Sequence, residues 1–180
     1  AYDRSSKPFW NPSQVMTDKP KSSAAQRRSA ARFAAIQALY QAELSQLPAD
    51  DIVREFSDFR LDGEGIRDLD EPNDNLIDPD RGFFADLVQG VTTRVVDLDG
   101  LINSALEKDW TSKRLETVLR SILRAGTYEL MMREDVPMRV VITEYVDAAH
   151  SFFDENEPKL VNAVLDRIGK TLRAGEIGQK

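Results

Sequence analysis

Three arginines stand at the start of the first helix that the sequence predicts: Arg27, Arg28 and Arg32. Arg28 and Arg32 are four residues apart, so they share one face of a helix. Cations at a helix N-terminus oppose the helix dipole, which favours negative groups there. An external phosphate would relieve this conflict, and guanidinium groups bind phosphate well. A solvated, frayed helix end explains the same residues at a cost of about 0.3–1 kcal/mol, so the residue types alone leave both interpretations open.

Single-stranded RNA is bound where arginines lie near aromatic rings on which bases can stack. The aromatic candidates are Tyr40, Phe152 and Phe153. Each of these rings, considered alone, fits the hydrophobic core better than a stacking surface.

The charge of the chain is unevenly distributed. Residues 1–32 hold seven Lys or Arg against two Asp, whereas the whole chain has a formal net charge of −7. A positive first segment on an acidic body can bind a polyanion locally. A flexible, solvated tail has the same composition.

Residue types that carry catalysis or bind metals are scarce. The single histidine, His150, has no nucleophile motif beside it, and the chain has no cysteine. Gly169-Lys170-Thr171 lacks the earlier glycine of a phosphate-binding loop and would close a helix rather than open one. The acidic residues between 70 and 80 lack the spacing of a calcium loop, and prolines interrupt them. We therefore expect no catalytic residues, no cofactor and no metal site.

The spacing of apolar residues predicts an all-α fold, a compact bundle of about seven helices. In the first half of the chain, helices are expected from Ser22 or Ser23 to about Gln46, over 49–59, and from Asp80 to about Lys108 with a bend at Gly100. In the second half, they are expected from Thr111 or Ser112 onward, from Pro137 to Phe152 or Phe153, and from Asn156 or Glu157 to Leu172. The stripe of the first helix includes Tyr40, Leu44 and Leu47. The stripe of the last includes Val161, Val164, Leu165, Ile168 and Leu172.

The expected organisation is one helical domain over 22–175 with two subdomains, 22–108 and 109–173, and a tail at 176–180. Residues 1–21 are predicted to be disordered, and 1–15 to be either an upstream extension or an addition to the natural chain, since Met16 is a plausible start. Residues 60–79 form a long acidic loop of unknown role. The absence of a signal segment and of a long apolar run predicts a cytoplasmic protein without membrane association.

Five sequence blocks stand in a fixed order between about residues 22 and 172. They are RRSAAR at 27–32 with AIQALYQ at 35–41, FADLVQGV at 84–91 with LDGLI at 98–102, ILRAGTYEL at 122–130 with DVP at 135–137, VITEYV at 141–146, and KLVNAVLD at 159–166. Together and in this order they resemble the NusB family of bacterial transcription antitermination factors, in particular its alphaproteobacterial members. The last block is the most specific of the five.

The resemblance implies a NusB-like fold and a non-enzymatic role in antitermination. It implies that the chain binds the boxA element of nascent ribosomal RNA together with the ribosomal protein NusE. With other Nus factors, that complex would act on RNA polymerase. Whether the chain forms a homodimer in the absence of the partner is left open by the sequence.

The same resemblance assigns RNA contacts to particular residues. The family's RNA-binding positions correspond to Arg27, Arg28, Arg32, Tyr40, Phe152, Asn156, Lys159 and Leu160. Tyr40 also corresponds to a position at the NusE interface. The sequence departs from family patterns at Ser29 and Ala30, where arginine is common, at Leu160, where Phe is common, and at Leu119, where some relatives are acidic.

Two other classes of function are compatible with a helical module of this kind. One is a protein-interaction module that does not bind RNA directly. The other is an RNA cytosine methyltransferase, which would require a catalytic domain with a cysteine that this sequence does not contain.

Overall fold

The computed structural model describes residues 22–60, 77–108 and 110–177, and within them the protein is all-α. Seven α-helices and no strand occur in these ranges, which confirms the predicted fold class. The α-helices are α1 (Ala24–Ser45), α2 (Ala49–Glu55), α3 (Arg81–Thr93), α4 (Val95–Ala105), α5 (Thr117–Met132), α6 (Met138–His150) and α7 (Asn156–Leu172). A π-helical turn, Phe56–Arg60, extends α2, and single 3₁₀ turns lie at Ser112–Arg114 and Ala174–Glu176.

Helix α1 begins at a capping box. The Ser23 hydroxyl accepts a hydrogen bond from the Gln26 amide at 3.1 Å, and the Gln26 side chain accepts one from the Ser23 amide at 2.8 Å. The helix ends at Gln46, whose left-handed conformation (φ 55°) closes the last turn just before Pro48. Both ends lie within one residue of those expected from the sequence.

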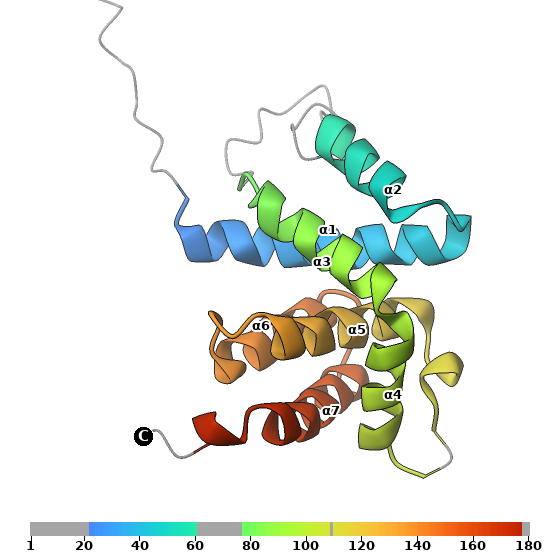
Figure 1. Ribbon diagram of the computed structural model, residues 1–180, viewed down its shortest axis with the longest axis vertical. Helices are drawn as coiled ribbons and strands as arrows, with labels where there is room; N and C mark the ends of the chain where they lie inside the picture. Colours follow the sequence, from blue (N-terminus) through green and yellow to red (C-terminus); the bar gives the residue numbers. More distant parts are fainter. Residues whose placement is uncertain (1–21, 61–76, 109, 178–180) are drawn as a thin grey trace, which may run out of the picture.

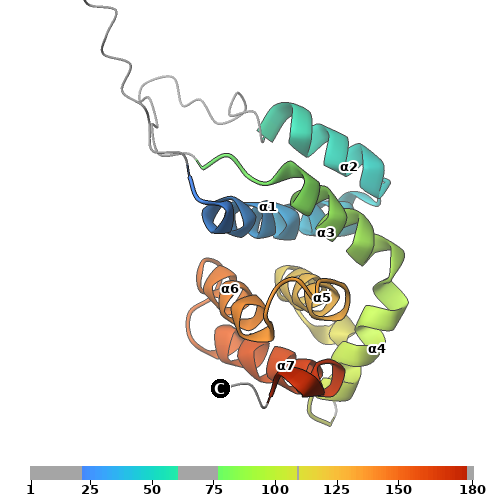
Figure 2. The ribbon, with the colours of Figure 1, turned by 60° about the vertical axis from the view of Figure 1, so that its left-hand side comes forward.

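The helices form two layers (Figures 1 and 2). Helices α1, α2 and α3 pack together above α4, α5, α6 and α7. Helix α5 is central, because it packs against α1 and α3 above and against α4, α6 and α7 below. Its small residue Gly126 allows this packing, since a Cβ atom there would lie 2.7 Å from the Leu165 side chain.

The single long helix expected over 80–108 is wrong, because the chain turns at Arg94 between α3 and α4 (Figure 1). The hydroxyls of Thr92 and Thr93 donate to backbone carbonyls one turn earlier, a pattern that competes with the helical ladder. The apolar period continues across the turn because both helices pack against α5. Gly100, where a bend was expected, lies inside α4.

Two other helix boundaries differ from expectation, and one residue expected in the core of α7 is exposed. Helix α5 begins at Thr117, not near Thr111, since residues 112–114 form a separate 3₁₀ turn. Helix α6 ends at His150, before the two phenylalanines. Helix α7 begins at Asn156 and buries Val161, Val164, Leu165 and Ile168 as predicted, but Leu172 is exposed.

The predicted disorder of residues 1–21 and most of the acidic loop lie outside the described residues, as does most of the 176–180 tail. The division into two subdomains near residue 109 stays a prediction. Helix α5 packs against both layers, so the contacts alone do not draw a boundary there. Among the described residues, no helix is both long and apolar enough to cross a membrane.

Candidate functional site

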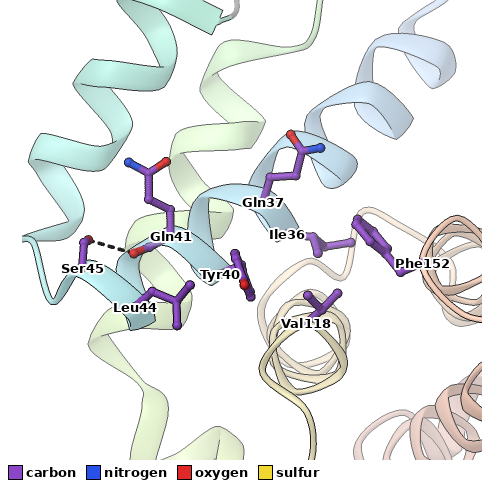
Figure 3. Close-up of a pocket in the computed structure, with 8 residues that line it drawn as sticks. All are labelled: Ile36, Gln37, Tyr40, Gln41, Leu44, Ser45, Val118 and Phe152. Atoms are coloured by element: carbon purple, nitrogen blue, oxygen red, sulfur yellow. Dashed lines mark hydrogen bonds between the residues drawn. The ribbon is translucent and has the colours of Figure 1, made fainter.

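An open apolar groove of about 640 Å³ lies between α1, the start of α5 and the turn after α6. Figure 3 shows Tyr40 and Leu44 from α1, Val118 from α5 and Phe152 directed toward it. Its rim carries amide and hydroxyl groups from α1. The eight lining residues are Ile36, Gln37, Tyr40, Gln41, Leu44, Ser45, Val118 and Phe152.

Three apolar side chains of this groove are unusually exposed. Tyr40 is 39% exposed, Leu44 62% and Phe152 37%. The sequence pattern assigned Tyr40 and Leu44 to the core stripe of α1, which is wrong, because neighbouring helices leave both side chains exposed at the groove. Phe152 is anchored from behind, since its ring stacks on Phe33 with centroids 5.3 Å apart. The groove therefore presents a fixed aromatic ring and a phenol to solvent.

Two of the three predicted arginines lie at the surface of α1. Arg27 is 44% exposed in its side chain, with Nη2 3.6 Å from an Asp78 oxygen. Arg28 is 33% exposed, with Nη1 3.3 Å from Asp135 Oδ2. Both groups are paired with carboxylates at the surface, where ion pairs are weak and exchange readily.

Arg32 lies inside the protein. Its side chain is 4% exposed, its Nε and Nη2 donate to the two oxygens of the buried Glu129 at 3.0 and 2.5 Å, and its Nη1 lies 3.3 Å from Glu144. Burial alone lowers the pKa of the Arg32 guanidinium, but the hydrogen bond and charge of Glu129 outweigh it and raise that pKa. The sequence expectation that Arg32 faces RNA therefore meets a guanidinium already paired with the protein's own carboxylates.

The remaining candidates lie at the start of α7, immediately after Phe152. Asn156 and Lys159 are exposed, and the Lys159 ammonium lies 3.9 Å from Glu155. Leu160 is half-buried and packs against the core. None of the three lines the groove. The structure therefore brings Tyr40 and Phe152 together, whereas Asn156, Lys159 and Leu160 follow Phe152 along the chain outside the groove.

Sequence reasoning missed most of the groove's other lining residues. Gln37, Gln41 and Ser45 follow one another at four-residue spacing on α1, which would place them on one face. This spacing could have indicated a shared polar face, but polar side chains at such spacing also occur on ordinary solvated helix surfaces. Val118 carried no such signal, since it also belongs to the apolar stripe of α5.

His150 and Gly169-Lys170-Thr171, which the sequence offered as weak candidates for catalysis or phosphate binding, do not line the groove. His150 is exposed at the end of α6. Gly169 lies in the last turn of α7 against Met138, so Gly169-Lys170-Thr171 closes a helix as expected. Nowhere in the described ranges do histidine or acidic residues gather into a possible metal site.

Comparison with known proteins identifies the family. The family model described as "NusB family" matches residues 29–170. The chain belongs to the NusB family. Proteins named "Transcription antitermination protein NusB" are 48% identical over 149 residues in Rhizobium rhizogenes and 48% over 157 residues in Sinorhizobium fredii. These alignments cover 83% and 87% of this chain and 89% and 94% of the relatives.

Solved NusB structures share the fold. T. maritima NusB superimposes with a TM-score of 0.64 at 27% identity, covering 88% of this chain and 99% of that one. The solution structure of NusB from Aquifex aeolicus gives 0.61 at 26% identity, covering 86% and 95%. A chain in the "Crystal Structure of a Plectonemic RNA Supercoil" gives 0.65 at 25% identity, covering 86% and 99%. The resemblance found in the sequence, including its alphaproteobacterial character, is thereby confirmed.

Proposed function

We propose that this NusB-family protein is a non-enzymatic, cytoplasmic antitermination factor that binds single-stranded RNA of the boxA type along α1 and the α6–α7 turn. The proposal extends to its partners: the ribosomal protein NusE, the other Nus factors and RNA polymerase. The observation that carries it is the exposed pair Tyr40 and Phe152 in one groove of a chain so similar to named antitermination proteins. One structural relative comes from the crystal structure of an RNA supercoil, which supports the same class of ligand.

Each candidate residue has a role that suits its surroundings. Arg27, Arg28 and Lys159 are surface cations that can neutralise phosphates. Phe152 and Tyr40 offer faces for stacking, and stacking on an aromatic side chain contributes roughly 1–3 kcal/mol per base.

The other candidates act at the edge of this surface. Asn156 supplies a neutral hydrogen-bonding amide, and Leu160, half-buried near the start of α7, anchors this helix on the core. Arg32 is assigned a positioning role, because its ion pair with Glu129 joins α1 to α5 beneath the surface.

NusE supplies what the acidic body lacks. The protein has a net charge of −7, so an RNA that extends beyond the arginines meets repulsion. A basic partner at the Leu44 end of the groove, away from Phe152, would cover that exposed side chain and add positive charge beside the RNA (Figure 3). Without the partner, the same apolar surface is available to a second copy of the chain, as a homodimer.

A binding titration tests the RNA site. Fluorescence anisotropy would measure the affinity for a labelled boxA-containing single strand and for a scrambled strand, with and without NusE. The double variant Tyr40→Ala and Phe152→Ala should weaken binding at least tenfold, whereas Val96→Ala, an exposed residue of α4 that is 86% exposed, should not. Equal affinity of the groove variant and the unaltered protein would refute the RNA site.

The same titration separates the two other functions. A protein-interaction module would bind NusE but show no affinity for either RNA, alone or in the complex. A methyltransferase would modify the RNA when a methyl donor is added to the mixture. The proposal predicts that the RNA stays unmodified.

A further inference from the structure

Three guanidinium groups surround one buried ring. Arg28, Arg32 and Arg133 each have their central carbon 5.0 Å from the centroid of Phe83, which is 3% exposed. Cations favour the face of an aromatic ring, so Phe83 holds these like charges close together. Arg32 is neutralised from within by Glu129, whereas the other two guanidinium groups reach the surface.

Those two surface arginines share one carboxylate. Asp135 Oδ1 accepts from Arg133 Nε at 2.8 Å, and its Oδ2 accepts from Arg133 Nη2 at 3.0 Å and from Arg28 Nη1 at 3.3 Å. The hydrogen bond from Arg133 is the main reason that the pKa of Asp135 is lowered to about 2. Two guanidinium groups that converge on one small oxyanion match the donor geometry that a phosphate requires.

We propose that Arg28 and Arg133 form a phosphate-binding pair at the end of the RNA surface, and that Asp135 occupies this pair until an RNA phosphate displaces it. The inference rests on the proposed function and adds Arg133, which the sequence did not indicate as a site residue. Asp135 thus acts as an internal competitor that lowers RNA affinity.

The exchange is feasible because Arg133 keeps a second carboxylate partner when Asp135 leaves, and because Asp135 is exposed to solvent. Arg133 is fixed from its other side by Asp86, whose Oδ2 lies 3.0 Å from Nη1. Asp86 is fixed in turn by the Tyr128 hydroxyl at 2.8 Å. Asp135 lies on the turn between α5 and α6 with 51% of its side chain exposed, so it can rotate into solvent without opening the core.

The pair lies near the groove along α1 but on another side of the helix. Phe33, the ring on which Phe152 stacks, follows Arg28 by five residues, about 7.5 Å along the helix axis and about 140° around it. Figure 1 shows the start of α1 above the turn that leads into α6. To contact both Phe152 and the pair, one RNA strand must therefore pass part of the way around the start of α1.

The first experiment removes the competitor. Asp135→Asn keeps the size of the side chain but removes its charge, and it should tighten binding of the boxA-containing strand by about fivefold, the equivalent of one exposed ion pair. Glu134→Gln is the matched control, since it removes the same charge from the neighbouring exposed residue and should change the affinity much less. Thermal melting of both variants verifies that the fold is retained.

The second experiment tests Arg133 itself. Arg133→Gln should reduce the slope of log affinity against log salt by about 0.7, the loss of one phosphate contact on a single strand. Arg139→Gln, an exposed arginine at the start of α6, is its control and should leave the slope nearly unchanged. In the Arg133→Gln background, Asp135→Asn should no longer tighten binding.

The outcomes distinguish the two proposals. Unchanged or weaker binding by Asp135→Asn, or an unchanged salt slope in Arg133→Gln, would overturn the phosphate pair while the groove variants still report RNA binding. Failure of the unaltered protein to bind the RNA, alone and with NusE, would overturn the proposed function and this inference with it.

Discussion

The ion pair of Arg32 with Glu129 gives the most decisive prediction about how α1 is held. Arg32→Ala leaves the carboxylate of Glu129, which is fully buried, with the Tyr145 hydroxyl at 3.0 Å and no compensating charge. Breaking one side of a buried ion pair costs about 3–5 kcal/mol. For a chain of this length, that lowers the melting temperature by roughly 6–20 °C.

Removing both charges should restore most of that loss. In the double variant Arg32→Met and Glu129→Gln no unpaired charge remains buried, and the new amide can still bond to Tyr145. The matched control is Arg54→Ala, which breaks an exposed pair with Asp51 at 3.7 Å and should change stability by less than about 1 kcal/mol.

Urea denaturation followed by circular dichroism measures these free energies of unfolding, and RNA titrations of the same samples separate stability from binding. Arg32→Met with Glu129→Gln should keep at least half of the RNA affinity once it is folded. The reasoning would be refuted by an Arg32→Ala protein that loses less than about 1 kcal/mol but no longer binds RNA. That result would mean that the guanidinium faces the ligand and not Glu129.

Four further outcomes are expected from other contacts. Gly90→Ala should destabilise the protein by about 1–3 kcal/mol in the same denaturation assay, because its Cβ would lie 2.1 Å from the Tyr128 ring. Its control, Gly100→Ala, should stabilise the protein by about 0.5–1 kcal/mol, because a Cβ there would have no atom within 4 Å. The pKa of Asp135 is lowered to about 2, so its contribution to stability is present above pH 4 and is lost toward pH 2; acid titrations should therefore fall less steeply for Asp135→Asn. Burial, aided by Asp86, raises the pKa of Tyr128 to about 12, so its contribution is complete below pH 10 and is lost as the pH rises through 12; ultraviolet titration of the phenol should follow this. Arg173→Met should cost at least about 3 kcal/mol, because the guanidinium donates to four backbone carbonyls around the end of α5, and a smaller loss in calorimetry would contradict this.

The fold could be predicted from the sequence wherever local signals coincide with packing. The capping box at Ser23, the termination before Pro48 and the position of Pro158 in the first turn of α7 are local, and the structure has them as expected. The turn at Arg94 could not be predicted from apolar spacing, because the spacing reports only which face is buried. Both helices beside the turn bury that face on α5.

The candidate site was predictable in its residue types but not in its arrangement. Arginines near a helix start gave no indication of their partners, and only tertiary packing brings Glu129 to Arg32 and Asp135 to Arg28 across about a hundred residues of sequence. Apolar periodicity likewise assigned Tyr40 to the core, since the pattern does not reveal which apolar positions the neighbouring helices leave uncovered. The RNA contacts themselves stay predictions.

Photo-crosslinking tests the central claim most directly. A boxA-containing strand with a photoreactive uridine at each position in turn would be irradiated with the protein and NusE, and the attached peptides would be identified by mass spectrometry. The proposed surface predicts adducts on the peptides that carry Arg28, Tyr40 and Phe152. Adducts confined to α4, around the exposed Val96, would contradict it.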